Sequence, residues 1–365
     1  MQKVKLETVT PIHVGSGNVL RFGSDFVQDR LCSPEGERPV VGIIDPGKVL
    51  SIIGQSNLDK WVSTIEKGES TKAFLSHIGK TCTVDSYSRR LLESRSESVF
   101  PTDTLREQIH DAFGRAYLPG SSIKGAIRTA VLSESVEALQ RQGNITPYYQ
   151  AEGALFGRSP NDDVFRFLRV GDAYFGNSKK NTILLRMQSL NITKRKLWDT
   201  SKTQLVEAIP KDSVCEFTLD LKTDRISESK VKFSCLDSEQ SLFHAINRHT
   251  STLLKDEKKI WQHYATGGMD GAQMVSDYLD AVQVLQDETS SCTDGRSCIL
   301  RIGYASGWRF ITGAWTELYG TTVFGEIIAK SRPGNYNRYS EYIFPKTRRV
   351  DADAGIIGFV KLTLI

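Results

Sequence analysis

A turn of small residues that opens directly into a long helix is the feature that most constrains this 365-residue chain. Pro119 and Gly120 favour a tight turn, and Ser121 or Ser122 is a natural N-cap. The pattern predicts a helix over about residues 121–141, ending at Gly143. Because small and apolar residues occupy most faces of this helix, we expect it to pack against a sheet.

The start of this helix has the chemistry of a phosphate-binding site. The first amides of a helix lack intrahelical partners, and the helix dipole favours an anion there. Lys124 and Arg128 stand four residues apart, so both cations lie on one face. The alternative is an ordinary capped helix with two solvated cations, and these residues alone do not separate the two interpretations.

The remaining segments predict an α+β fold. Residues 2–10 alternate as a strand does and run into a glycine-rich loop at residues 11–17. A hairpin is expected at residues 26–44, and Asp45–Pro46–Gly47 then leads into a short helix. Strands and helices that alternate in this way favour a ferredoxin-like arrangement. Further helical patterns lie at residues 57–78 and 103–113, and further strands at 164–175, 181–190, 213–222, 297–302 and 356–364.

Two amphipathic helices at residues 239–263 and 271–287 are expected to form a hairpin that packs on its own domain. We therefore divide the chain into two ferredoxin-like domains, 1–225 and 226–365. The second domain carries the helical hairpin, at about 239–287, and a glycine-rich loop at 303–313.

This late loop is the third segment suited to an anion. Gly303 and Gly307 let the backbone approach a ligand closely, and Gly313 follows them. Arg301 and Arg309 supply charge, and Trp308 offers a face for a base. The loop has neither the Gly-x-Gly-x-x-Gly spacing of dinucleotide-binding proteins nor the Gly-Lys-Ser/Thr of a Walker loop.

Charge is informative through its distribution. The net charge is only +4, from 47 basic and 43 acidic residues. However, residues 177–198 carry six cations and no acid, and residues 330–349 carry six cations, one acid and several aromatic residues. Cations beside aromatic faces are typical of single-strand nucleic-acid binding, although a solvated basic loop is the commoner explanation of each segment.

The composition indicates a reduced compartment and no membrane. Six scattered cysteines lack a Cys-x-x-Cys pair, and no apolar h-region follows Met1, so we expect a cytoplasmic protein with free thiols. No apolar run approaches the ~20 residues that cross a bilayer.

The motifs resemble the RAMP superfamily of CRISPR-associated RNA-binding proteins. The similarity lies in residues 10–17 (TPIHVGSG), 118–129 (LPGSSIKGAIRT) and the glycine-rich loop at 303–313. Residues 163–172, 206–210, 344–349 and 358–361 extend it to the family of fifth subunits of type III-A (Csm) effector complexes.

That resemblance implies ferredoxin-like, RRM-type folds and a structural role at the 3′ end of the CRISPR RNA (crRNA). The implied partners are crRNA, the neighbouring backbone and small subunits, and, further, target RNA and the nucleases that trim the 3′ end; no cofactor or metal is implied. The RNA-binding residues that we predict are His13, Gly15, Ser16, Gly17, Gly120, Ser121, Ser122, Lys124, Arg128, Arg301, Gly303, Gly307, Trp308 and Arg309.

Catalytic chemistry is not predicted. Of the six histidines, His13 alone lies in an anion-compatible loop, whereas His249 belongs to an apolar stripe and is expected in the core. His244 and His249 are five apart and turn away from each other on a helix, which argues against a shared zinc. Three hypotheses remain: a crRNA-binding structural cap, which we favour, a guide-processing endoribonuclease using His13, and a protein adaptor with little RNA affinity.

Overall fold

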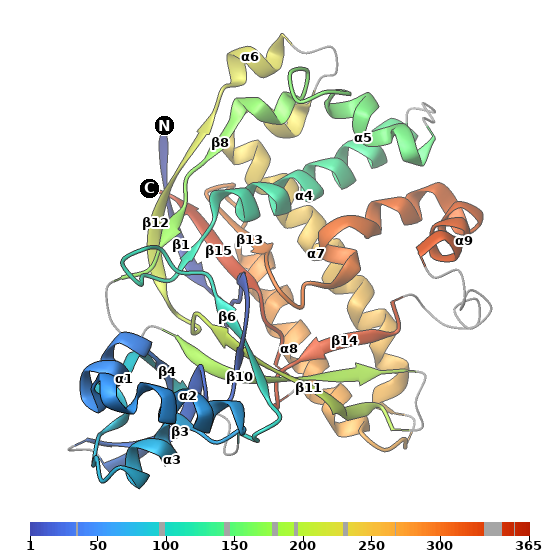
Figure 1. Cartoon of the computed structure of the whole chain (residues 1–365). Coiled ribbons are helices and arrows are strands. Elements are labelled where there is room, and N and C mark those ends of the chain that lie inside the picture. Colours follow the sequence, from blue (N-terminus) through green and yellow to red (C-terminus); the bar gives the residue numbers. More distant parts are fainter. Residues whose placement is uncertain are drawn as a thin grey trace.

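The computed structural model describes residues 1–33, 36–94, 99–141, 147–176, 182–192, 196–228, 233–266, 268–331, 345–353 and 355–365. Two sheets organise these residues, with helices packed mainly beside the first sheet (Figure 1). Within the described ranges, no helix combines the length and apolar character needed to cross a membrane.

The first sheet has the ferredoxin-like order. Its strand order is β13-β15-β1-β12-β8, and all of its neighbours pair antiparallel. Together with α4 and α7 it reads β1-α4-β8-β12-α7-β15 along the chain, which is the βαββαβ pattern, and the α+β prediction is confirmed. Its strands are β1 (Gln2–Thr8), β8 (Leu168–Val170), β12 (Val214–Leu221), β13 (Ser297–Arg301) and β15 (Phe359–Leu364).

Two long helices cover one side of this sheet (Figure 1). Helix α4 is Gly120–Arg141, and its buried Ile123 and Ile127 join Val4 and Leu6 of β1 in one apolar core. Helix α7 is Glu239–Ala265, with Ser238 as its N-cap. The start of α4 therefore lies close to the predicted position, because the turn and the cap residues that define it are local.

The predicted helical hairpin is also confirmed. Helix α7 and helix α8, Ala272–Ser291, share a second core that includes Trp261 and Tyr278. His249 is buried on α7, as expected. The smaller helices around this body are α5 (Tyr148–Phe156), α6 (Thr223–Ser227) and α9 (Gly320–Ser331).

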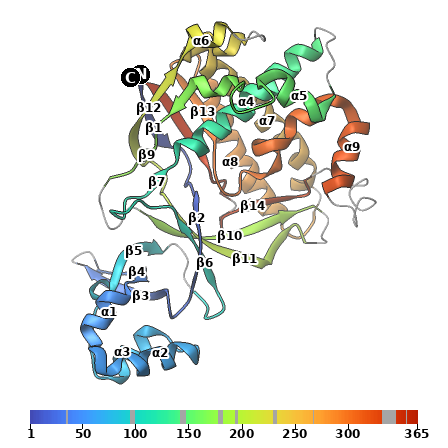
Figure 2. The same cartoon turned by 45° about the horizontal axis from the view of Figure 1, so that its top comes forward.

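The second sheet is mixed and larger. Its order is β2-β6-β11-β10-β5-β4-β3, and β14 pairs with β10 beside this path. The three helices α1 (Pro46–Ile53), α2 (Leu58–Glu66) and α3 (Thr71–His77) cover its β3-β4 end with a core of their own, the blue lobe of Figure 2. The strands are β2 (Gly15–Arg21), β3 (Phe26–Ser33), β4 (Gly36–Ile44), β5 (Ser88–Ser94), β6 (Thr104–Gln108), β10 (Ile183–Asn191), β11 (Trp198–Ala208) and β14 (Thr347–Val350).

One predicted helix is wrong. Residues 104–108 form strand β6, which lies between β2 and β11. Leu105 and Glu107 are buried and Arg106 between them is exposed, which is the period of a strand. Sheet pairing with distant segments therefore decides the conformation of this short sequence.

A separate two-stranded sheet pairs β7 (Tyr117–Leu118), which directly precedes α4, with β9 (Ala173–Tyr174).

The division at residue 225 stays a prediction. Strand β1 pairs with β12 from the first part of the chain and with β15 from the second, so one sheet contains strands from both parts. Whether the eight-stranded sheet counts as a second ferredoxin-like unit also stays a prediction.

Candidate nucleic-acid interface

The first and third glycine-rich segments meet in the structure. The amide of Tyr304 donates a hydrogen bond to the carbonyl of His13 at 2.8 Å. Gly303 has φ +83°, and a Cβ there would lie 2.3 Å from the same carbonyl oxygen. Only glycine therefore permits this contact between segments that are about 290 residues apart in sequence.

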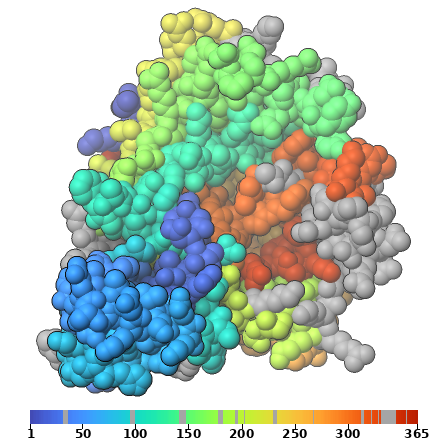
Figure 3. Space-filling view, in the orientation of Figure 1, coloured from blue at the N-terminus to red at the C-terminus, as the bar shows by residue number. Residues whose placement is uncertain are grey.

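Gln108 links the second segment to the same place. Its side-chain oxygen accepts a hydrogen bond from the amide of Val14 at 2.9 Å, and its side-chain nitrogen donates to the carbonyl of Tyr117 at 3.1 Å. Tyr117 begins the short strand that leads into α4. Hydrogen bonds to His13 and Val14 thus bring all three predicted segments together. In Figure 3, dark blue, teal and orange parts of the chain, which are far apart in sequence, lie side by side on the surface.

The exposed part of this junction is glycine backbone beside a cation and an aromatic ring. Gly15, Ser16 and Gly17 are exposed at the start of β2. The guanidinium carbon of Arg106 lies 5.8 Å from the ring centroid of Tyr304. Sequence reasoning missed both residues: the alternation of residues 104–108 contained the signal for Arg106, but a helix was predicted there.

Two buried carboxylates, of Glu107 and Glu207, lie next to the junction and stabilise it. Glu207 is fully buried and accepts hydrogen bonds from Arg90 at 2.8 Å, from the Thr182 hydroxyl at 2.9 Å and from the Gln108 amide at 3.2 Å. Arg90 also donates to Glu107 at 2.8 Å. Burial alone would raise the pKa of Glu107, but hydrogen bonds from Arg90 and Asn18 and the charges of the neighbouring arginines lower it to about 2.

His13 belongs to this support. It is 2% exposed, and its Nδ1 lies 2.6 Å from the carbonyl oxygen of Glu207. Burial lowers the pKa of His13 more than the neighbouring Glu207 raises it. Its ring also meets that of Tyr304 edge to face at 5.6 Å. His13 thus fixes the two glycine-rich segments from inside.

The first amides of α4 are not free, contrary to our prediction. The Gly120 amide donates to the Asp172 carboxylate at 2.7 Å. The amides of Ser122 and Ile123 both donate to the Pro119 carbonyl. Protein groups therefore satisfy donors that we expected to face phosphate, while Ser121 stays exposed beside them.

The two predicted RNA-binding cations of α4 have different surroundings. Arg128 forms ion pairs with Asp163 at 2.8 Å and Glu152 at 2.9 Å, and it lies over the ring of Phe156. Among the described residues, Lys124 has no ion-pair partner within 4.0 Å. Burial and the charge of Arg128 lower the pKa of Lys124. Lys124 is half-buried, the nearby Asp163 carboxylate opposes that shift, and a contact of Lys124 with phosphate stays a prediction.

The cations of the third segment are built into the protein. Arg301 is buried between the rings of Phe310 and Phe359, at 4.6 and 4.9 Å, and donates to the Ala305 carbonyl. Arg309 pairs with Asp256 at 3.0 Å and with Glu317 at 2.6 Å. The ring of Trp308 lies 5.6 Å from that of Phe324. Contacts within the protein therefore hold Arg301, Arg309 and Trp308 in place in the loop. RNA contacts by these three residues stay predictions.

Half of the twelve cations in the two basic segments lie outside the described residues, namely Lys179, Lys180, Lys194, Arg195, Arg332 and Arg338. Of the cations that are described, Arg186 pairs with Asp103 at 2.8 Å, and buried Arg348 pairs with Glu257 at 2.7 Å. These two arginines stabilise the fold.

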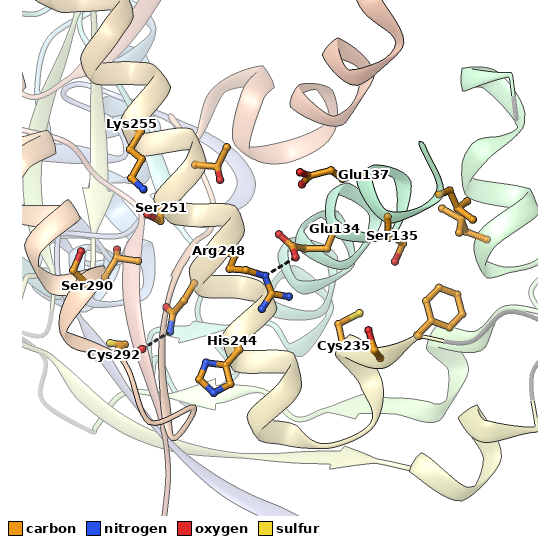
Figure 4. Close-up of a pocket in the computed structure, with 18 residues that line it drawn as sticks. Glu134, Ser135, Glu137, Cys235, His244, Arg248, Ser251, Lys255, Ser290 and Cys292 are labelled. Carbon is orange, nitrogen blue, oxygen red and sulfur yellow. Dashed lines mark hydrogen bonds and ion pairs between the residues drawn. The ribbon is translucent and has the colours of Figure 1, made fainter. Parts of the chain in front are cut away.

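A groove of about 680 Å³ lies apart from the junction, between α4, α7 and α8 (Figure 4). Arg248 crosses it to Glu134 at 2.8 Å, and the Asn247 side chain donates to the Cys292 carbonyl at 3.2 Å. None of the predicted site residues lines this groove. Among the described residues, no group of three or more histidine, cysteine or acidic side chains is arranged to hold a metal.

Comparisons with known proteins agree with this architecture. The sequence model of the RAMP superfamily matches residues 5–268, and the chain belongs to that superfamily. A CRISPR system protein, Csm5, of Streptococcus thermophilus is 33% identical over 121 residues, an alignment that spans 28% of this chain and 28% of that relative.

Two solved structures share the fold over nearly the whole length. One is a chain of a Csm–crRNA–target RNA ternary complex of a type III-A CRISPR-Cas system, with a TM-score of 0.71, 18% identity and 100% of both chains covered. The other is the Csm5 crystal structure of T. onnurineus, with a TM-score of 0.63, 17% identity and coverage of 98% of this chain and 99% of that one.

Proposed function

We propose that this chain is the crRNA-binding subunit of a type III-A CRISPR effector complex that caps the backbone at the crRNA 3′ end. The observation that carries the proposal is the convergence of three glycine-bearing segments around His13, with Arg106 and Tyr304 at the exposed side. Support comes also from the relatives, one of which is named Csm5 and one of which lies in a complex with crRNA and target RNA.

The binding mode follows from the chemistry of the exposed groups. Glycine backbone at residues 15–17 allows close approach of a sugar-phosphate chain, and Arg106 and Lys124 supply positive charge for its phosphates. Tyr304 offers a half-buried ring beside Arg106. Because such contacts are mostly to the backbone, we expect affinity without strong base preference.

The proposed role is structural. A general acid or base must reach the proton that it transfers, but His13 is almost fully buried and its Nδ1 faces the carbonyl of Glu207. Assistance to 3′-end maturation is then a matter of holding the RNA for other nucleases. The proposed protein partners are the neighbouring backbone and small subunits, with the trimming nucleases as further partners, and the proposed RNA partners are crRNA and target RNA.

The experiment is RNA filter binding across a salt series with Arg106→Ala and Lys124→Ala. Each variant should weaken binding to unrelated sequences about equally and reduce the slope of log K against log salt by about 0.7 per phosphate contact, the value for a single strand. Lys60→Ala is the matched control, because Lys60 is exposed on α2 in the lobe formed by residues 46–77. An affinity that does not change with salt in the wild type would favour the adaptor hypothesis instead.

A cleavage assay separates the structural role from the nuclease alternative. Purified protein incubated with repeat-containing RNA and a chelator should leave the RNA intact. Metal-independent cleavage that His13→Ala abolishes, while the variant keeps its thermal stability, would show that the chain is a nuclease.

A further inference from the structure

A rigid loop presents one aromatic ring to solvent beside the proposed interface. Phe113 is 86% exposed, the largest exposed fraction among the apolar side chains recorded for the described residues. The loop lies between β6 and β7 and is the teal projection at the left of Figures 1 and 2. A phenylalanine placed this way gains nothing for folding, because its ring stays in water.

The loop is ordered by one carboxylate. Asp111 accepts hydrogen bonds from the amides of Phe113 at 2.9 Å and Arg115 at 2.8 Å, and from the Arg115 guanidinium at 2.7 Å. The Gly114 amide donates to the Asp111 carbonyl at 3.0 Å. Gly114 has φ +79°, which a tight turn requires. The ring of Phe113 is therefore held out on a turn whose backbone donors are already satisfied.

Planar groups continue behind the exposed ring. The guanidinium carbon of Arg115 lies 5.7 Å from the centroid of Phe113 and 4.8 Å from that of Tyr174. Tyr174 stacks on Tyr117 at 5.2 Å with an interplanar angle of 24°. We call this stacked series, Phe113–Arg115–Tyr174–Tyr117, the ladder. The ladder limits the motion of Phe113, and rigid aromatic and arginine side chains contribute most of the binding energy in protein interfaces.

The charge of the loop favours a protein partner over RNA. The only cation of the ladder, Arg115, is ion-paired to Asp111 at 2.7 Å, and Tyr174 donates a hydrogen bond to Asp172 at 3.2 Å. Two carboxylates against one guanidinium leave the patch acidic, which repels phosphate. The same charges suit a protein surface whose rim is basic.

We infer that Phe113 is an anchor that inserts into an apolar pocket with a basic rim on the neighbouring subunit of the complex. The inference rests on the proposed function, since that function supplies the neighbour. The anchor loop, residues 111–115, lies only a few residues before the α4 turn, so the same part of the chain would join the RNA and the next subunit.

The test compares Phe113→Ser, Phe113→Leu and wild type in pairwise binding to the purified backbone subunit of the same type III-A system. Phe113→Ser should weaken binding at least about tenfold, and Phe113→Leu less, because leucine still fills part of an apolar pocket. Tyr149→Ser is the matched control, since Tyr149 is 71% exposed on α5, and it should bind like wild type.

Two further measurements keep the outcomes distinct. The thermal midpoint and the RNA affinity of the isolated chain should not change in Phe113→Ser, because the ring is in water. Equal subunit binding by Phe113→Ser and wild type would overturn the inference while leaving the proposed function intact. Loss of RNA affinity in the isolated chain would mean that Phe113 stacks on a base, which also overturns it. Failure of the wild type to bind either RNA or the backbone subunit would instead contradict the proposed function.

Discussion

At the scale of single residues, buried charge holds the interface in place. The carboxylate of Glu207 forms an ion pair with Arg90 next to the glycine-rich junction, and both side chains are largely buried. Glu207→Gln removes one of the two carboxylates that pair with Arg90, and the ion pair with Glu107 remains. The free energy of unfolding should therefore fall by at most about 3 kcal/mol, the cost of leaving a buried charge without any partner. Urea denaturation measures this change. The control is Glu93→Gln, which breaks an exposed pair with Arg38 and should lower it by less than about 1 kcal/mol.

A second residue makes stability depend on pH. Burial lowers the pKa of His249 from 6.5 to about 4. The unfolded chain therefore takes up a proton as pH falls through 6.5, while the folded chain does not until about pH 4. The neutral state of His249 should therefore cost no stability above pH 6.5. Between pH 6.5 and 4 it should lower the free energy of unfolding by about 3 kcal/mol. His249→Leu should reduce this slope in urea denaturation at stepped pH values, and an unchanged slope would assign the proton uptake to other groups.

At the scale of elements, the glycines of the third segment have unequal roles. Both Gly303 and Gly307 have positive φ, but a Cβ on Gly303 would strike the His13 carbonyl, whereas one on Gly307 would meet open space. Gly307→Ala should therefore reduce stability by only about 1–2 kcal/mol, the penalty of the left-handed conformation. Gly303→Ala should reduce it more and should also weaken RNA binding, because the two glycine-rich segments would separate. Equal effects in denaturation and filter binding would contradict the proposed junction.

Elements whose signals are local could be predicted from the sequence, and those set by distant pairing could not. The turn before α4 lies directly beside the helix that it begins, and the apolar stripes of α7 and α8 lie within those helices. The sequence predicts a helix where strand β6 lies, because five residues carry little periodicity and the partner strands β2 and β11 are distant in sequence. The ion pair between Arg90 and Glu207 joins residues that are 117 positions apart, so no local sequence pattern predicts it. The sequence predicts the three segments of the junction. It does not predict Arg106 and Gln108, because both residues lie on strand β6, where the sequence predicts a helix.

At the scale of the whole molecule, the first sheet joins both ends of the chain. Strand β1 lies between β12 and β15, and β15 in turn pairs with β13, so residues 1–225 without the rest would leave β1 as an edge strand. Val4 and Leu6 of β1 are fully buried in a core that Leu300 and Leu362 help to fill. Neither part of the chain therefore contains the complete sheet or the complete core.

Expression of residues 1–225 and 226–365 as separate fragments tests whether the junction of loops requires the whole chain. Each fragment alone should lack a cooperative thermal transition in circular dichroism, because the edge along which β1 and β15 pair is left without a partner in both fragments. Co-expressed fragments should form a complex that unfolds cooperatively and binds RNA, since the Tyr304–His13 contact is then restored between them. A cooperative transition in either isolated fragment would instead support the two-domain division predicted from the sequence. In that case the glycine-rich junction would form between two independently folded units. The association of these units, and not the folding of either one, would then limit the proposed RNA binding.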